Sequence, residues 1–348
     1  MDYNNLINKT NSKALFIAEA GINHDGDVEK AKKLVDIAVE AKADYVKFQS
    51  FKSDKLVTTT ALTSSYIKKG SNKGESFADL LKRLEMSVED HHVLKDYCNK
   101  KDIKFLSTAF DEESFDLLFS FGSDVVKVAS GDLTNIPFLR YRAKHNLPMI
   151  VSTGMATLGE IEEAVDAIVI KEGNEKIILM HCISWYPAEI NTANLRFMDT
   201  LRSAFGFPVG FSDHTLGINM SIAARAMGAL VLEKHFTLDT KQFGPDHAAS
   251  LNPIELEKLV RGIREVEAGL GSTVRKFDEK EVGQRKVHRR SLVVKNNINA
   301  GEEFTPENLT IKRPGTGIKP KYWYDVIGKT AKSRLEIDHL ITWSDVIQ

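Results

Sequence analysis

Cysteine, net charge and long apolar runs are all scarce in this chain of 348 residues. Its two cysteines, Cys98 and Cys182, are too few for a secreted scaffold held by disulfides. With 47 basic and 48 acidic residues the net charge is −1, so no overall field draws the chain to nucleic acid or to an anionic membrane. No apolar run reaches the ~20 residues that span a bilayer, and the polar amino terminus lacks the apolar core of a signal peptide. We therefore expect a cytoplasmic protein that binds neither nucleic acid nor membrane.

Eight short apolar runs recur along the first three quarters of the chain. They are apolar along most of their length rather than strictly alternating, which is typical of parallel strands buried on both faces. The runs are Ala14–Gly21, Ala43–Ser50, Ile103–Phe110, Val125–Gly131, Pro148–Gly154, Lys176–Cys182, Pro208–His214 and Leu230–Phe236.

Helical patterns fill the gaps between these runs. Thr157 and Glu160 have the spacing of a capping box, and the last helix is expected to begin at Pro253 and end at Gly271. A strand–helix unit repeated eight times predicts a closed (β/α)8 TIM barrel. The alternative is an open doubly wound sheet, but the turn after the first run lacks the Gly-x-Gly-x-x-Gly spacing of that fold.

The pattern of the sequence changes after Gly271. Residues 272–290 are charged and carry no long apolar run, as in a linker. From residue 291 short apolar strands are separated by glycine- and proline-containing turns, over a stretch close to the lower size limit for independent folding. We predict a catalytic barrel over residues 1–271, a linker over 272–290, and a small domain over 291–348 that leans on the barrel or on a second subunit.

Polar residues stand at the carboxyl end of every predicted strand, although a core strand needs none there. TIM-barrel active sites lie at these ends, so the pattern predicts a lined pocket. The ends supply Glu19, Asn23, His24, Lys47, Gln49, Ser107, Thr108, Lys127, Ser130, Ser152, Thr153, His181, Ser184, Ser212, Asp213, His214, Glu233, Lys234 and His235.

Two lysines are prominent at this rim. Lys47 and Lys127 end the second and fourth predicted strands, where they could meet. Nearby hydroxyl groups come from Thr108, Ser130, Ser152 and Ser184. A solvated strand end is the plain alternative for either lysine alone. Two lysines with several hydroxyls favour a phosphate-bearing small molecule.

Two histidines, His214 and His235, end the adjacent seventh and eighth strands. Neighbouring strands lie ~4.8 Å apart, so their imidazoles could share one divalent cation. Two ordinary hydrogen-bonded histidines are the alternative. The turn that carries Asp246 follows and would place a carboxylate nearby. By contrast, we expect His91 and His92 to lie on the surface of a polar helix.

Together these motifs resemble the sialic acid synthase family. The matching stretches are EAGINHDGD (Glu19–Asp27), VKFQSFK (Val46–Lys52), LSTAFDEES (Leu106–Ser114), KVASGD (Lys127–Asp132), STGMAT (Ser152–Thr157), HCISWYP (His181–Pro187), GFSDHT (Gly210–Thr215), EKHFT (Glu233–Thr237) and GPDHAAS (Gly244–Ser250). The tail stretch KRPGTGI (Lys312–Ile318) resembles the antifreeze-protein-like SAF domain of that family.

The resemblance implies an enzyme that condenses phosphoenolpyruvate with an N-acylated mannosamine. It implies Mn²⁺ or Mg²⁺ on His214 and His235, and a domain-swapped homodimer. The phosphoenolpyruvate site it implies consists of Lys47, Thr108, Lys127, Ser130, Ser152, Ser184 and Ser212. The sugar site it implies consists of Glu19, Gln49, Asp132, Tyr186, Asp246 and, from the partner subunit, an arginine equivalent to Arg313. Glu19 and Asp246 are the candidates for proton transfer.

Three departures from the family pattern bear on the acceptor sugar. Asp132 stands where many relatives carry Glu, and Ser184 stands where Asn is common. The stretch Val287–Arg290 lacks the aromatic residue that some relatives place near the acyl pocket. Our main hypothesis is N-acetylmannosamine as acceptor, giving N-acetylneuraminate. The alternative is a 2,4-diacetamido-2,4,6-trideoxymannose, giving N,N'-diacetyllegionaminate. A non-catalytic glycan-binding protein and a metal-dependent aldolase that uses pyruvate are the remote alternatives.

Overall fold

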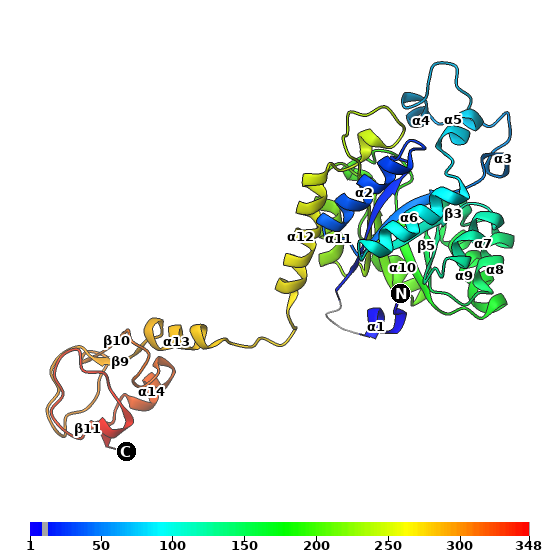
Figure 1. Cartoon of the computed structure of the whole chain (residues 1–348). Helices are drawn as coiled ribbons and strands as arrows, with labels where there is room; N and C mark the ends of the chain where they lie inside the picture. The colour runs from blue at the N-terminus through cyan, green and yellow to red at the C-terminus, as the bar shows by residue number, and fades with distance from the viewer. Residues whose placement is uncertain (9–12, 348) are drawn as a thin grey trace. The chain divides into compact units, whose positions relative to one another are not determined.

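The computed structural model describes residues 1–8 and 13–347 (Figure 1). Residues 9–12 of the predicted barrel domain and Gln348 of the predicted small domain lie outside the described residues. The chain divides into two compact units, Met1–Gly271 and Ser272–Gln348. Among the described helices, none combines the length and the apolar character needed to cross a membrane.

The first unit is a closed barrel of eight parallel strands in sequence order, with β1 paired to β8 (Figure 1). The predicted TIM barrel is therefore confirmed, and each predicted run contains one strand. The strands are β1 (Leu15–Gly21), β2 (Tyr45–Ser50), β3 (Lys104–Ala109), β4 (Val126–Val128), β5 (Met149–Ser152), β6 (Ile177–Cys182), β7 (Val209–Asp213) and β8 (Val231–His235).

Helices connect the strands and cover the barrel. They are α1 (Tyr3–Asn8), α2 (Val28–Glu40), α3 (Ser53–Leu56), α4 (Ser65–Lys69), α5 (Phe77–Leu84), α6 (Val88–Lys100), α7 (Glu112–Ser120), α8 (Ile136–Ala143), α9 (Leu158–Glu172), α10 (Phe197–Phe205), α11 (Asn219–Ala226) and α12 (Pro253–Leu270). The Thr157–Glu160 capping box forms at the start of α9. Short 3-10 turns are η1 (Ser130–Asp132), η2 (Ile190–Thr192) and η3 (His247–Ala249).

Alternation along the strands divides the core into two layers. Outward side chains such as Phe16 and Val46 pack with the helices in the main apolar cluster. Inward side chains such as Ile17, Leu106 and Ile178 form a separate cluster with Leu6 of α1. Each such buried aliphatic side chain contributes ~1.5–3 kcal/mol. Apolar packing thus closes one end of the barrel, and the polar residues are left for the carboxyl end.

The second unit has its own small core. Its elements are α13 (Glu279–His288), β9 (Ser291–Val294), β10 (Leu309–Lys312), η4 (Pro320–Tyr322), α14 (Trp323–Val326), β11 (Thr330–Ala331), η5 (Trp343–Asp345) and β12 (Val346–Ile347). Leu292, Phe304 and Ile341 are among its buried residues. Helix α13 falls within residues 272–290, the segment expected to be a linker, and its side chains are not buried within the described unit.

Candidate active site

A cavity of about 600 Å³ opens at the carboxyl ends of the barrel strands. It brings together residues from every strand or strand-end loop of the barrel. The predicted site residues that line it are Glu19, Lys47, Gln49, Thr108, Lys127, Ser130, Ser152, Ser184, Tyr186, Ser212, His214, His235 and Asp246. The barrel collects them because all eight parallel strands end on the same side.

Strand alternation decides which polar rim residues face the cavity. Glu233 points inward, whereas its neighbour Lys234 points outward, 3.0 Å from the buried Asp213 carboxylate. Lys234 also donates to the carbonyl of Thr215. The expectation that Asp213 and Lys234 line the pocket was wrong, because both stabilise the outer side of the barrel wall.

Three further histidines make hydrogen bonds elsewhere in the barrel and do not line the cavity. His181 is hydrogen-bonded to the carbonyl of Ala193 at 2.7 Å, and His24 accepts the Gly26 N–H at 3.0 Å. His91 is buried, 2.6 Å from the Ser50 hydroxyl, because α6 packs on β2 and β3. The surface position expected for His91 was therefore wrong.

Two lysines and two carboxylates meet at the floor of the cavity. Lys47 Nζ lies 2.9 Å from Glu19 Oε2 and 3.5 Å from Glu233 Oε2. Lys127 Nζ lies 3.7 Å from Glu233 Oε1. All four side chains are buried. Glu233 was predicted to stand at the pocket rim but was given no catalytic or binding role, although it shares the inward face of β8 with His235 and this two-residue spacing could have suggested one.

Burial and the nearby opposite charges shift the pKa values of these groups in different directions. Burial raises the pKa of Glu19 to about 7, although Lys47 opposes the rise. Burial would raise the pKa of Glu233 as well, but Lys127 and Lys47 outweigh it and hold that pKa below its ordinary value. Burial lowers the pKa of Lys127. Glu233 is thus the anionic partner of both lysines, and Glu19 is the carboxyl group able to carry a proton near neutral pH.

Hydroxyl groups surround the two ammonium groups. Lys47 Nζ donates to Thr108 at 3.0 Å, Lys127 Nζ donates to Ser152 at 2.7 Å, and Ser212 donates to Glu233 at 2.9 Å. The set can hold a tetrahedral anion through charge-assisted hydrogen bonds.

Gly154 opens a space between two further hydroxyls of this set. A Cβ at Gly154 would lie 2.2 Å from Ser184 Oγ and 2.8 Å from Ser130 Oγ. Ser130 also accepts the Gly154 N–H at 3.1 Å. Only glycine therefore leaves room for both hydroxyls at this point.

His214 and His235 face one another across the cavity. Their ring centroids are 5.6 Å apart, and the ring of Tyr186 lies 4.1 Å from that of His214. His214 donates from Nδ1 to the carbonyl of Ile183 at 2.6 Å, which leaves Nε2 as the lone-pair nitrogen. Burial lowers the pKa of His214 to about 4 and that of His235 well below its ordinary value. Both imidazoles are therefore neutral, the form that binds metals.

A divalent cation fits this pair. His235 Nδ1 is buried and has no hydrogen-bond partner among the described residues. Asp246 Oδ2 lies 3.7 Å from it. Within residues 1–8 and 13–347, no group of three or more His, Cys, Asp or Glu side chains could hold a metal. An ion held by two imidazoles would take its other ligands from substrate and water, as open catalytic sites do.

The loop that carries Asp246 is held from behind by His247. His247 is buried, 2.6 Å from the Thr237 hydroxyl and 3.3 Å from Asp25. Burial raises the pKa of Asp246 to about 6. A carboxylate in this state can orient a hydroxyl group or exchange a proton.

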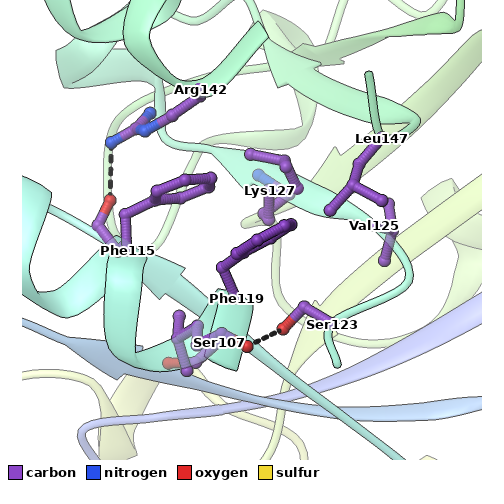
Figure 2. Close-up of a pocket in the computed structure, with 11 residues that line it drawn as sticks. Ser107, Phe115, Phe119, Ser123, Val125, Lys127, Arg142 and Leu147 are labelled. Atoms are coloured by element: carbon purple, nitrogen blue, oxygen red, sulfur yellow. Dashed lines mark hydrogen bonds between the residues drawn. The ribbon is translucent and has the colours of Figure 1, made fainter. Parts of the chain in front are cut away.

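Asp132 is engaged away from the cavity. Its Oδ2 lies 3.0 Å from Arg142, a fully buried residue whose guanidinium also donates to the carbonyl of Ala109 at 2.7 Å. Figure 2 shows Arg142 beside Phe115, at a second cavity of about 10 Å³ behind the barrel wall. The pair ties η1, which carries Ser130, to the end of β3.

Arg313 lies in the second unit, directly after β10, and its side chain is exposed. The turn that follows is fixed on α13, since Gly315 N–H donates to the Lys286 carbonyl at 2.8 Å. Arg313 belongs to the second unit, whereas the residues that line the cavity all belong to the first.

Comparisons with known proteins agree with this geometry. A model described as the NeuB family matches residues 34–275, and a SAF domain model matches residues 289–347. An N,N'-diacetyllegionaminic acid synthase from Campylobacter jejuni is 45% identical over 331 residues, 94% of this chain and 99% of that protein. Human N-acetylneuraminate-9-phosphate synthase is 34% identical over 94% of this chain and 90% of that protein. A structure of N-acetylneuraminic acid synthetase from Leptospira borgpetersenii in complex with citrate matches with a TM-score of 0.69 and 36% identity, covering 79% of this chain and 90% of that one.

Proposed function

Because this chain belongs to the NeuB family, we propose that it is a synthase that joins phosphoenolpyruvate to an N-acetylated amino sugar of the mannose series. The products would be a nine-carbon 2-keto-3-deoxy acid and phosphate. The observation that carries the proposal is the meeting of Lys47 and Lys127 with a neutral histidine pair in one cavity. This arrangement supports an anion cradle beside a site for a carbonyl group.

The cradle side of the cavity accounts for phosphoenolpyruvate. Lys47, Lys127 and the surrounding hydroxyls would hold its phosphate and carboxylate groups. Ser130, Ser152, Ser184 and Ser212 complete this part of the site. Glu233 keeps the lysines charged and in place before the substrate arrives. When the phosphate group binds, its negative charge takes over part of the neutralisation that Glu233 provides. This lowers the free-energy cost of burying the phosphate group.

The other side of the cavity accounts for the acceptor. His214 and His235 would hold Mn²⁺ or Mg²⁺, which when bound polarises the carbonyl oxygen of the open-chain sugar. Gln49, Tyr186 and Asp246 line this side and would orient the sugar. Asp132 is bonded to Arg142, so its contact with the sugar requires that this pair rearrange.

The reaction can be written so that its atoms balance. C3 of phosphoenolpyruvate attacks the aldehyde carbon, and the aldehyde oxygen takes a proton. Water adds to C2, and the tetrahedral intermediate collapses as the C2–O bond to phosphate breaks. Glu19 and Asp246 line the cavity and would move these protons, and the lysines would stabilise the departing phosphate.

A second copy of this chain is the partner that we propose. Met155, Trp185, Leu216 and Phe243 are exposed apolar side chains on the loops that follow β5, β6, β7 and β8. Apolar side chains gathered at a cavity mouth are typical of an interaction surface. We propose a domain-swapped homodimer in which the small domain of one chain covers the barrel of the other. Arg313 would then hold the N-acyl group in the partner's barrel.

The test is phosphate release from phosphoenolpyruvate with Mn²⁺ and either N-acetylmannosamine or 2,4-diacetamido-2,4,6-trideoxymannose. We expect release that requires the sugar, with a condensed product of matching mass. Release without sugar would indicate a phosphatase. A product formed from pyruvate without phosphate release would support the aldolase alternative. No turnover with either sugar would contradict the proposal.

A further inference from the structure

The wall of the barrel is least extensively paired where β3 meets β4. Strands β2 and β3 pair along the whole of both strands. Between β3 and β4, by contrast, Thr108 and Lys127 form the only register pair among the described residues. β4 is also the shortest strand of the barrel, with three residues. Main-chain hydrogen bonds therefore give the ends of these two strands little mutual support.

The weakly paired strand ends carry members of the anion cradle, which consists of the two buried lysines and the hydroxyls around them. Thr108 accepts a hydrogen bond from Lys47 at 3.0 Å, and Lys127 donates to Ser152 at 2.7 Å. Ser130, in η1 just after β4, lines the same cavity. The geometry of the cradle thus depends on how the ends of β3 and β4 are held together.

Arg142 of α8 joins the two strand ends from behind the wall. Its Nη2 donates to the carbonyl of Ala109, at the end of β3, at 2.7 Å. The same nitrogen lies 3.0 Å from Oδ2 of Asp132, in η1. Figure 2 shows the first bond as the dashed line from Arg142. One nitrogen therefore bridges the residue after Thr108 and the turn that carries Ser130.

The burial of Arg142 is not explained by stability. Its side chain is fully buried, with the guanidinium carbon 3.4 Å from the centroid of the Phe138 ring. Its Nε and Nη1 have no hydrogen-bond partner among the described residues. Apolar side chains of similar volume often stabilise a core as well as a buried ion pair does, or better. The bridge made by Nη2 therefore points to a role in geometry.

Asp132 faces Arg142 rather than the cavity. Ser130 and Gly131 of η1 are among the described residues that line the cavity, and Asp132 is not. The Asp132 side chain is 13% exposed, and its carboxylate is the anionic partner of Arg142. The short turn η1 is thus held at one end by this ion pair and presents a hydroxyl to the cavity at the other.

We propose that Arg142 and Asp132 are positioning residues for the phosphoenolpyruvate site. They hold the ends of β3 and β4 at the separation that the anion cradle requires. The inference rests on the proposed function for the identity of the anion, and it assigns Asp132 a role outside the sugar site. Neither side chain touches the anion, since each acts through the strand end that it holds. A displacement of about 1 Å can reduce catalytic efficiency on the order of 100-fold, so a small movement of the strand ends is enough.

The double variant Arg142→Met/Asp132→Asn tests the proposal. It removes both charges together, so no buried charge is left unpaired. Titration calorimetry with phosphoenolpyruvate and Mn²⁺, without sugar, should show a Kd about tenfold above that of the wild type. The KM of the acceptor that the wild type uses should stay within about twofold of the wild-type value.

The other outcomes separate this proposal from the proposed function. An unchanged Kd in the double variant would overturn the positioning role. A rise in the acceptor KM alone would return Asp132 to the sugar site and overturn it as well. A similar rise in both constants would assign the ion pair to general stability. Wild-type protein that does not bind phosphoenolpyruvate would instead contradict the proposed function.

Arg225 of α11 provides a matched control. It is also buried, and it also joins a carboxylate to a main-chain carbonyl, with Nε 3.0 Å from Glu267 and Nη1 donating to Ala229 at 3.3 Å. Ala229 precedes β8, at the end of the barrel away from the cavity. In Arg225→Met, Glu267 keeps Arg264 as its partner. We expect a lower Tm with an unchanged Kd for phosphoenolpyruvate. A loss of affinity equal to that of the double variant would overturn the proposal.

The single variants show whether the two residues act as a unit. Asp132→Asn alone should raise the Kd less than the double variant, because the amide oxygen can still accept from Arg142. Arg142→Met alone should raise it as much as the double variant. Asp132→Asn should therefore add nothing once Arg142 is replaced. Independent effects that multiply in the double variant would show that the two residues do not act through one bridge.

Discussion

Glu233 of β8 lies 3.5 Å from Lys47 of β2, although the two strands are separated by β1 in the closed barrel. The same carboxylate lies 3.7 Å from Lys127 of β4. One inward glutamate therefore balances two buried lysines in the absence of substrate. When a phosphate-bearing molecule binds, its negative charge adds to that of Glu233, which already neutralises part of the charge of the two lysines.

Removal of that carboxylate should weaken the unliganded protein more than the liganded one. In Glu233→Gln the Lys127 ammonium loses its carboxylate partner while Lys47 keeps Glu19, and a buried charge left unpaired costs ~3–5 kcal/mol. We expect a lower Tm without ligand and a larger rise in Tm when phosphoenolpyruvate is added than in the wild type. Glu113→Gln, at the surface pair with Lys55, is the control. An equal rise in Glu233→Gln and wild type would exclude this role.

Loss of a lysine should act on one substrate only. Lys127→Met removes a buried cation that donates to Ser152 in the cradle, and a charge-assisted hydrogen bond contributes ~1.5–3 kcal/mol. We expect KM for phosphoenolpyruvate to rise by about 10- to 100-fold, with a small change in the acceptor KM. Initial rates at varied concentrations of each substrate would measure both. The exposed Lys55→Met variant should match the wild type, and a selective change in acceptor KM would show that Lys127 is misassigned.

The swapped dimer predicts complementation between two impaired chains. Lys127→Met disables the barrel, and Arg313→Ala should raise the acceptor KM without affecting phosphoenolpyruvate. In a mixed dimer the intact barrel of the Arg313→Ala chain would receive Arg313 from the Lys127→Met chain. After co-refolding at low acceptor concentration we expect about a quarter of wild-type activity under random pairing. Activity no higher than that of the two variants apart would place Arg313 outside the partner's site.

His24 should make the barrel sensitive to acid. Burial lowers its pKa from an ordinary value of 6.5 to about 4. Between these values the unfolded chain binds more protons than the native one, so the free energy of unfolding falls as pH falls through this window. The loss should be on the order of 3 kcal/mol.

The substitution His24→Asn can test this dependence. Asparagine can still accept the Gly26 N–H through its side-chain oxygen, but it does not titrate. Urea unfolding at pH 7 and pH 4.5 should therefore show a smaller loss of stability in the variant. His288→Asn, on the exposed helix α13, should keep the wild-type loss. An identical pH dependence in His24→Asn and wild type would contradict the assignment.

Local patterns in the sequence were enough to predict the barrel and most of the residues at the carboxyl ends of its strands. Buried parallel strands require apolar runs, and helix ends require caps such as Thr157, so both signals lie within a few neighbouring residues. The rule that barrel strands present their carboxyl ends to the active site then located Lys47, Lys127, His214 and His235.

Only the tertiary structure decided which rim residues act together. A strand's phase fixes whether Glu233 or Lys234 faces the cavity, and that phase depends on packing against helices far away in the sequence. Asp132 meets Arg142, and Gly70 meets Gly244, through contacts between separate elements. Sequence by itself thus determined the fold and the residue types of the site, because these depend on short-range periodicity. Packing between distant segments decided the pairing of charges and the contacts of Asp132 and Gly70.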